Sequence, residues 1–476
     1  MSSLLLLALA RSAAAAVSVG DPSDSADLVA DASDNAIKAV YDIEPILYQT
    51  NAIEGPYYYT DGNDTSADHT TFTVDANDTS VIVVTEGTSL NLSYVDVVKY
   101  GYSSNLYARS PHVSSKATLT QPSYQASFYG LNAAINVAND STATITHSNI
   151  TVHNGAANVF AYGASTIVYI SDSDLYSSGP VSHGLYAAGN GTIVGRRLRH
   201  YSGGNRCSSF SGDNPAGTVN VTDSVAHTAG IGSALFYALG TVAGTAVAGR
   251  AERAPALFMD GPQAAVFDAV DFEAGLLAGT VMFSSQTRTA GATLSFTDSK
   301  LNVTDEGAPA LWFGNTIAEV ALRSSRLVTV SGLLLVANSS QVTQEFSYFA
   351  GAEENAAILP AEVDVVVEES DLVGDVVVYN GSAVTWSLNS YSTWAGKVVL
   401  GEGGDVNGTV DVVLDATSKW TVTGDSVVGN FTNEDAAFGN VESGGFTVTY
   451  DGSADGNAWL NGSTYELSGG GSLKPL

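Results

Sequence analysis

The fold is indicated by a short repeated unit, first seen in ITHSNI (145–150), ISDSDL (170–175) and IVGRRL (193–198). Each begins with an apolar residue, continues through polar or small residues and ends on a second apolar residue. The same unit returns as FTDSKL (296–301), LRSSRL (322–327) and VEESDL (367–372). Looser copies end at Val225, Phe272, Ser392 and Trp420, and a weak copy ends near Gly249. A unit that recurs along most of a chain predicts a repeat architecture rather than a set of unrelated domains.

The spacing of these units is nearly constant. From Ile150 to Trp420 the average interval is about 24.5 residues, if the step from Leu327 to Leu372 counts as two. A second apolar segment follows many of the units and ends in Gly or Asn, the residues that tolerate the positive φ of a tight corner. Examples are NVFAYG (158–163), GLYAAG (184–189), ALFMDG (256–261), ALWFGN (310–315) and LLLVAN (333–338).

Within each unit the apolar residues alternate with a spacing of two, and Val, Thr, Ile, Tyr, Ser and Gly dominate. This spacing excludes a helical solenoid, whose apolar residues would follow a period of 3.6. A β-sandwich would not repeat one strand–corner–strand unit in register. We therefore predict an all-β fold, a right-handed parallel β-helix of 11–14 coils with 24–25 residues per coil, because no such coil can bury its apolar face alone.

The composition limits the partners of the chain. Its 476 residues carry 49 acidic and 18 basic side chains, a net charge of −31, so nucleic acid and anionic membrane surfaces would be repelled. No apolar run after the N-terminus reaches the roughly 18 residues that a membrane span needs. The single cysteine, Cys207, excludes a disulfide scaffold and indicates a small buried residue or a turn residue.

The two ends differ from the repeat. An apolar run at 4–10, followed by alanines at 13–16, predicts a signal peptide over residues 1–16. We assign 17–69 to an acidic N-terminal segment or cap, 70–420 to the β-helix and 421–476 to C-terminal coils and a cap. A short helix between 21 and 47 could cover the first coil, and a solvated linker is an equally good interpretation.

Potential N-glycosylation sites support secretion to the extracellular space or the cell wall. The chain has thirteen Asn-x-Ser/Thr sequons, where chance would give roughly five. The competing explanation is that a composition rich in Asn, Ser and Thr raises the count. The sequon asparagines are Asn63, Asn77, Asn91, Asn139, Asn149, Asn190, Asn220, Asn302, Asn338, Asn380, Asn407, Asn430 and Asn461.

With these repeats, the chain resembles the secreted right-handed parallel β-helix proteins of fungi and bacteria, which share the pectin-lyase-like fold and carry adhesin-like repeats. The resemblance covers roughly 70–420 and includes YGLNAAI (129–135); the segments LDATSKWTVTGDS (414–426) and STYELSGGGSL (463–473) are also similar. It implies a structural or adhesive role without catalysis, with cell-wall or matrix glycans as partners. It also leaves an alternative, a polysaccharide lyase or glycoside hydrolase.

One cluster could carry such chemistry. Arg197 lies 23 residues after Asp174, close to one coil, so the two could stack on one face. Paired carboxylates would serve acid–base work on a glycosidic bond, and an arginine would serve as base or carboxylate clamp. The competing interpretation is a corner histidine beside a solvated basic strip, which we favour because the Asp and His patterns of polygalacturonases are missing. The candidates are Asp172, Asp174, His183, Arg197, Arg199, His200 and Asp223.

No cofactor is expected beyond weak calcium binding, for which Asp172 with Asp174, Asp364 with Asp371, and GEGGDVNG (401–408) supply oxygen atoms near turns. Thr-x-Thr pairs, as at 71/73 and 144/146, would suggest ice binding if they formed a ladder. They do not recur steadily from unit to unit, so we interpret them as outward strand residues.

Overall fold

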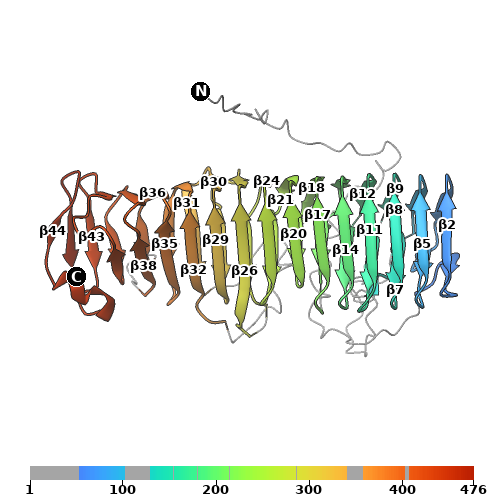
Figure 1. Ribbon diagram of the computed structural model, residues 1–476, viewed down its shortest axis with the longest axis horizontal. Helices are drawn as coiled ribbons and strands as arrows, with labels where there is room; N and C mark the ends of the chain where they lie inside the picture. Colours follow the sequence, from blue (N-terminus) through green and yellow to red (C-terminus); the bar gives the residue numbers. More distant parts are fainter. Residues whose placement is uncertain are drawn as a thin grey trace, which may run out of the picture.

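The computed structural model describes residues 53–101, 129–153, 155–179, 181–213, 215–285, 287–339, 358–401 and 407–476. This part is 55% strand and 2% helix, and it winds into a parallel β-solenoid of about 15 turns. The turns stack along one axis into a rod (Figure 1). The predicted all-β solenoid is confirmed, with more turns than the 11–14 expected.

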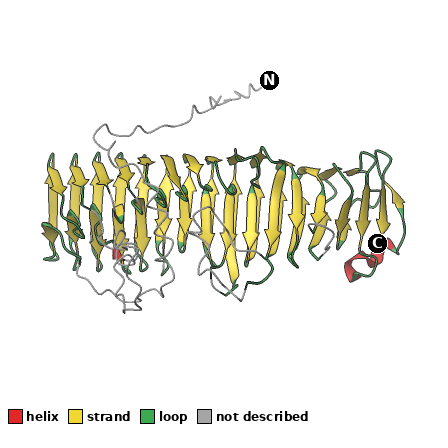
Figure 2. Ribbon diagram, turned by 180° about the vertical axis from the view of Figure 1, so that it is seen from behind, coloured by secondary structure: helices red, strands yellow, loops and turns green. Residues whose placement is uncertain are grey.

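Each turn of the rod contributes strands to parallel sheets that run along its length (Figure 2). Sheet A has 13 strands: β1 (Tyr57–Tyr59), β4 (Ile82–Val84), β7 (Ile135–Ala138), β10 (Ala157–Tyr162), β13 (His183–Ala188), β16 (Phe210–Gly212), β19 (Phe236–Ala238), β22 (Leu257–Asp260), β25 (Thr280–Phe283), β28 (Leu311–Gly314), β31 (Leu333–Asn338), β34 (Asp375–Val378) and β37 (Val398–Leu400).

Sheet B follows sheet A in every turn. It has 14 strands: β2 (Asp64–Asp68), β5 (Ser89–Ser93), β8 (Thr142–Thr146), β11 (Ile167–Ser171), β14 (Thr192–Arg196), β17 (Thr218–Thr222), β20 (Thr241–Thr245), β23 (Ala264–Asp268), β26 (Ala290–Thr297), β29 (Ile317–Arg323), β32 (Glu362–Glu368), β35 (Ala383–Asn389), β38 (Thr409–Leu414) and β41 (Phe431–Asn433).

The third side is divided into sheet C and sheet D. Sheet C has ten strands: β3 (Thr71–Val74), β6 (Asp96–Lys99), β9 (Asn149–His153), β12 (Asp174–Ser178), β15 (Arg199–Ser202), β18 (Val225–Ile231), β21 (Ala248–Arg253), β24 (Asp271–Ala274), β27 (Lys300–Val303) and β30 (Arg326–Thr329). Sheet D has four: β33 (Asp371–Val373), β36 (Thr393–Gly396), β39 (Lys419–Val422) and β42 (Val441–Glu442).

The C-terminal end forms a small sheet E of β40 (Ser426–Val428), β43 (Thr447–Tyr450), β45 (Ser472–Pro475) and β44 (Tyr465–Glu466), beside the short 3₁₀ helix η3 (Asp455–Leu460). Strand β44 pairs antiparallel with β45, whereas β43 pairs parallel with it. The parallel stack therefore continues beyond residue 420, and its last strand is covered by an antiparallel one.

The first turn begins earlier than expected. Strands β1 and β2 pair in parallel with β4 and β5, so residues 57–69 belong to the solenoid and not to the cap assigned to 17–69. This turn, together with the turns after residue 420, explains the higher number of turns. The predicted signal peptide (1–16) and the possible helix between 21 and 47 lie outside the described residues.

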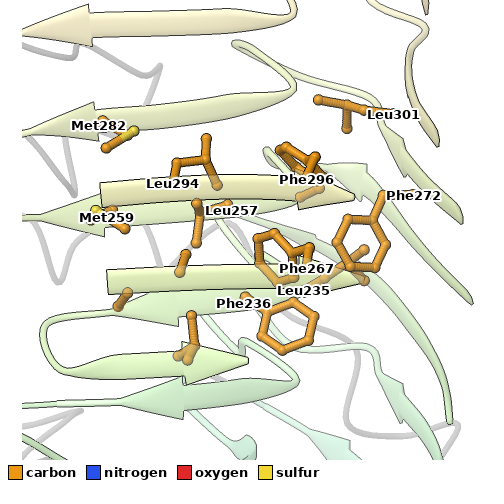
Figure 3. Close-up of a cluster of buried hydrophobic side chains, with 14 of the residues drawn as sticks. Leu235, Phe236, Leu257, Met259, Phe267, Phe272, Met282, Leu294, Phe296 and Leu301 are labelled. Carbon is orange, nitrogen blue, oxygen red and sulfur yellow. The ribbon is translucent and has the colours of Figure 1, made fainter. Parts of the chain in front are cut away.

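The interior of the rod is one continuous apolar cluster made by inward residues of all the sheets. Figure 3 shows a section of it, in which Phe236, Phe267, Phe272 and Phe296 lie close together. The ring of Phe267 has its centroid 4.9 Å from that of Phe236 and 5.2 Å from those of Phe272 and Phe296. Each side chain thus packs against its counterpart one turn away, so burial in any turn depends on its neighbours.

The repeat predicts that the final apolar residues of its units form one interior column, and they do so with two exceptions. On sheet C, Leu175 pairs with Ile150, and Phe272, Leu301 and Leu327 follow in the same register. Two other predicted members, Leu198 and Val225, are not in this column, because the register places His200 and Ala226 there. Leu198 is buried at a corner, and Val225 is half-buried on the outer face.

The polar pair of the repeated unit builds the corner between sheets B and C. Its first residue has φ between 47° and 53°, the left-handed conformation that turns the chain. These B–C corner residues are His69, Tyr94, His147, Asp172, Arg197, Asp223, Ala246, Ala269, Asp298, Ser324 and Glu369.

The second residue of the pair is most often a buried serine. The Ser299 hydroxyl donates to the Thr297 carbonyl (2.6 Å) and accepts from the Val270 N–H of the previous turn (3.1 Å). Ser173 and Ser325 make equivalent bonds. This serine ladder satisfies backbone groups that a corner would otherwise leave buried without partners, which explains why the unit contains Ser so often.

Candidate functional site

The aspartates and arginines of the candidate cluster form ion pairs between neighbouring turns. At the B–C corner, Arg197 Nε lies 2.5 Å from Asp172 Oδ1. On the outer face of sheet C, Arg199 Nε donates to Asp174 Oδ1 over 2.6 Å. The hydrogen bonds from Arg197 lower the pKa of Asp172 to about 2, so this carboxylate stays ionised and holds no proton to give to a leaving group.

A third ion pair continues the same pattern. Arg196 Nε, at the end of β14, lies 3.2 Å from Oδ2 of Asp223 in the next turn. All of these side chains are at least partly exposed. Exposed pairs of this kind contribute little to stability because water screens them, and here they link one turn to the next along the rod.

The two histidines lie away from these carboxylates. His200 points into the interior, where Nδ1 lies 2.8 Å from Ser209 Oγ and Nε2 lies 3.2 Å from Ser177 Oγ. His183 begins β13 on sheet A, and its Nδ1 accepts from the Ser208 N–H (3.1 Å). Burial lowers the pKa of both histidines to about 3, so both are neutral near pH 7.

The seven candidates therefore occupy four places. Asp172, Arg197 and Asp223 lie at the B–C corner, whereas Asp174 and Arg199 lie on the outer face of sheet C. His200 is in the interior, and His183 is on sheet A. The structure brings together aspartates with arginines, and it does not bring either histidine into the ion-pair ladder.

A different group of polar side chains meets on the outer face of sheet A. The Tyr186 hydroxyl donates to the carboxylate of Asp213, which follows β16 in the next turn. The ring of Tyr186 lies 4.7 Å from that of His183 and stacks at 5.2 Å on that of Phe160. All four residues are buried.

Sequence reasoning could not pair His183 with Tyr186. Regular alternation puts residues three apart on opposite faces of a strand. In β13, however, a Cβ on Gly184 would meet the interior ring of His200, and Leu185 packs into the same interior. Two consecutive inward positions bring His183 and Tyr186 to the same side, and no sequence signal indicates this irregularity.

The sequon asparagines differ in accessibility. Asn338 is buried and its amide lies 3.3 Å from the Tyr379 hydroxyl, while Asn302 and Asn430 are half-buried. The other ten are exposed: Asn63, Asn77, Asn91, Asn139, Asn149, Asn190, Asn220, Asn380, Asn407 and Asn461.

At one corner, the fold itself explains two sequons. Asn139 and Asn380 have positive φ between sheets A and B, a conformation that asparagine tolerates well. The hydroxyl residues two positions later, Ser141 and Ser382, are buried and accept backbone N–H groups of the previous turn. At this corner the fold itself favours Asn followed two residues later by Ser. The number of sequons can therefore rise for structural reasons, without glycosylation.

Cys207 lies in another buried hydroxyl ladder, at the corner between sheets C and A. Its Sγ accepts the Ser182 N–H (3.0 Å) and its own N–H donates to the Ser233 hydroxyl (2.9 Å). The thiol thus stands where neighbouring turns place a serine, in agreement with the predicted buried or turn residue.

The oxygen atoms considered for calcium are not gathered. Asp172 and Asp174 bind arginines, whereas Asp364 and Asp371 belong to β32 of sheet B and β33 of sheet D. Within the described ranges, no three His, Cys, Asp or Glu residues are placed to hold a metal ion. Residues 402–406 of the glycine-rich segment lie outside them. In the same ranges, no helix is both long and apolar enough to cross a membrane.

No protein-family model, curated protein or solved structure matches the chain.

Proposed function

We propose that the protein is a secreted, glycosylated rod that serves a structural or adhesive role in a cell wall or matrix, as the pectin-lyase-like resemblance implies. The observation that carries this proposal is the way in which the outward polar side chains are used. The ion pairs of Asp172, Asp174 and Asp223 join consecutive turns, and none of these carboxylates is paired with a second carboxylate across a groove.

A rod of stacked turns suits adhesion for a physical reason. Each outward position recurs every turn at the strand spacing of about 4.8 Å, so about 15 turns extend over roughly 70 Å. Weak contacts repeated over that length add up when the partner is itself a polymer. Uncharged wall or matrix glycans fit this role better than polyanions, because the chain carries a net charge of −31.

Binding to insoluble glycans tests the proposal. Purified protein is mixed with isolated wall or matrix polysaccharide and sedimented, with an unrelated acidic protein as control. The proposal expects cosedimentation with at least one uncharged polysaccharide and no release of soluble sugar. Protein that stays in the supernatant with every polysaccharide would contradict it.

The juxtaposition of His183, Tyr186 and Asp213 favours one alternative, a glycan-active enzyme with its site on sheet A. In that site Asp213 would accept a proton through Tyr186, and His183, protonated on Nε2, would donate a hydrogen bond. The test is product formation from pectate, polygalacturonate or neutral glycans. Activity that is lost in Asp213→Asn and His183→Ala but kept in Asp174→Asn, with circular dichroism unchanged, would favour the enzyme over the adhesive rod.

A further inference from the structure

The outer face of sheet B between β5 and β26 is nearly free of charge. The strand register aligns its outward side chains in three rows along the rod. The first row is Ser89, Thr142, Ile167, Thr192, Thr218, Thr241, Ala264 and Thr293. The third row, four residues later in each strand, is Ser93, Thr146, Ser171, Arg196, Thr222, Thr245, Asp268 and Thr297. The middle row is Asn91, Thr144, Tyr169, Val194, Asn220, Ala243, Val266 and Ser295.

We name these 24 side chains the hydroxyl face. Arg196 and Asp268 are its only charged members, and Ser or Thr occupies 14 of the positions. The strands that border this face on each side carry acidic residues, which are Asp64 and Asp68 on β2 and Glu319 on β29. An uncharged area bounded by acidic strands, on a chain with a charge of −31, is complementary to an uncharged partner.

The threonine hydroxyls of this face are available to a partner. Thr241 and Thr245 are exposed, and Thr218 and Thr222 are half-exposed. None of these four side chains hydrogen-bonds another group in the part of the chain that the structure describes, and the same holds for Thr192 and Thr293, whereas Thr146 bonds Ser93 (3.3 Å). Their hydroxyl groups can therefore bond water or a partner.

We propose that the hydroxyl face binds ice. Threonine is restricted in χ1. Where threonines follow one another from turn to turn, at Thr192, Thr218 and Thr241 in the first row and at Thr222 and Thr245 in the third, a methyl group and a hydroxyl group therefore recur at nearly fixed positions every 4.8 Å or so. Water molecules bound to such rows are held in a regular array, which can join the surface of an ice crystal. The face lacks the charged groups that would impose hydration shells of their own, apart from Arg196 and Asp268.

Two observations favour ice over a flat, uncharged polysaccharide. Sugar rings are commonly held by stacking on aromatic side chains, and Tyr169 is the only aromatic residue of the face. Threonines also stand four residues apart within single strands, as Thr218 with Thr222 and Thr241 with Thr245, so that they fall into the first and third rows. The Thr-x-Thr pairs, two residues apart, concealed this periodicity in the sequence.

The test uses the full chain made in a bacterial host, because a glycan on Asn91 or Asn220 would cover the face. Inhibition of ice recrystallisation and shaping of single ice crystals are measured. One variant carries Thr241→Tyr and Thr245→Tyr on β20, and a matched control carries Thr71→Tyr and Thr73→Tyr, which are exposed on β3 of sheet C. Tyrosine is well tolerated in strands, and circular dichroism and thermal unfolding check the fold.

The parent protein and the Thr71/Thr73 control are expected to inhibit recrystallisation at equal concentrations. The Thr241/Thr245 variant should need at least about tenfold more protein for the same effect. Three results would overturn the proposal: no inhibition by the parent, an equal loss in both variants, or cosedimentation with crystalline polysaccharide that only the Thr241/Thr245 variant loses. The last result would assign the face to a glycan, in agreement with the adhesive role.

Discussion

Single residues inside the rod have little freedom, because each one packs between its counterparts in the turns before and after it. Leu301 is fully buried between Phe272 and Leu327. Leu301→Asp would place an unpaired charge in this interior, so we expect a loss of more than about 4 kcal/mol in the free energy of unfolding. Urea denaturation of Val330→Asp, at a valine that is 62% exposed, is the control and should change stability by less than about 0.5 kcal/mol. Similar losses in the two variants would contradict the assigned interior.

The buried histidines make the stability of the native state depend on pH. Burial lowers the pKa of His200 from 6.5 to about 3, so between these values the unfolded chain binds a proton that the native chain does not. The stabilisation is complete above pH 6.5 and is lost progressively as the pH falls toward 3, by up to about 1.4 kcal/mol per unit. His183 acts with the same sign.

A second group, the half-buried Asp260, acts in the opposite direction. Burial raises the pKa of Asp260 from 3.8 to about 6, so its effect favours the native state as the pH falls through that range. The His200→Gln variant isolates the histidine term, since Asp260 is common to both proteins. We expect the unfolding free energy of the variant to decline less than that of the parent between pH 7 and 4.5. Equal declines would show that His200 does not titrate as assigned.

Among the elements, the B–C corner is the most regular, and its serines are expected to matter more than their size suggests. Ser299→Ala leaves the Val270 N–H without its partner in a buried corner, which should cost about 1–3 kcal/mol. Ser295→Ala, on the preceding strand β26 and facing outward, should change stability by less than about 0.5 kcal/mol. Thermal unfolding of the two variants measures the difference. A smaller destabilisation by Ser299→Ala would mean that a water molecule replaces the lost hydrogen bond to the Val270 N–H.

The elements also show which features could be predicted from sequence. The polar pair of the repeated unit and the apolar segments of sheet A correctly predicted where strands lie. They are visible in the sequence because a left-handed corner favours particular residues at its first position and a buried serine at its second. The interior column was misplaced by two residues at Leu198 and by one at Val225, since in those turns the interior positions hold His200 and Ala226 rather than large aliphatic residues. The first turn was missed because β2, DTSAD, has no apolar residue larger than alanine.

On the scale of the whole molecule, secretion and glycosylation remain predictions. The mature chain should begin after the alanine run at 13–16 and migrate above its calculated 49.0 kDa until an N-glycosidase is added. Mass spectrometry of glycopeptides should find carbohydrate on exposed asparagines outside the hydroxyl face, such as Asn149 and Asn461, more often than on the buried Asn338. A cytosolic, unglycosylated chain that retains Met1 would contradict this.

The candidate site was predictable only in part. The expected stacking of Asp174 with Arg197 was wrong, because Arg197 pairs with Asp172 and Asp174 pairs with Arg199. The contact of His183 with Tyr186 and the rows of the hydroxyl face depend on strand irregularity and register. Those two properties arise from packing between turns, and local sequence does not encode them.

One continuous stack of turns holds the described residues in register along the rod. Spin labels at Thr146, Thr222, Thr297 and Asn389 test it, since these residues share an outward row of sheet B on every third strand. With Cys207→Ser as background, the 146/297 and 222/389 pairs should each be about 29 Å apart, and the 146/389 pair about 43 Å. Pulsed electron spin resonance that gives unequal distances for the first two pairs, or no increase for the third, would contradict a continuous stack in this register.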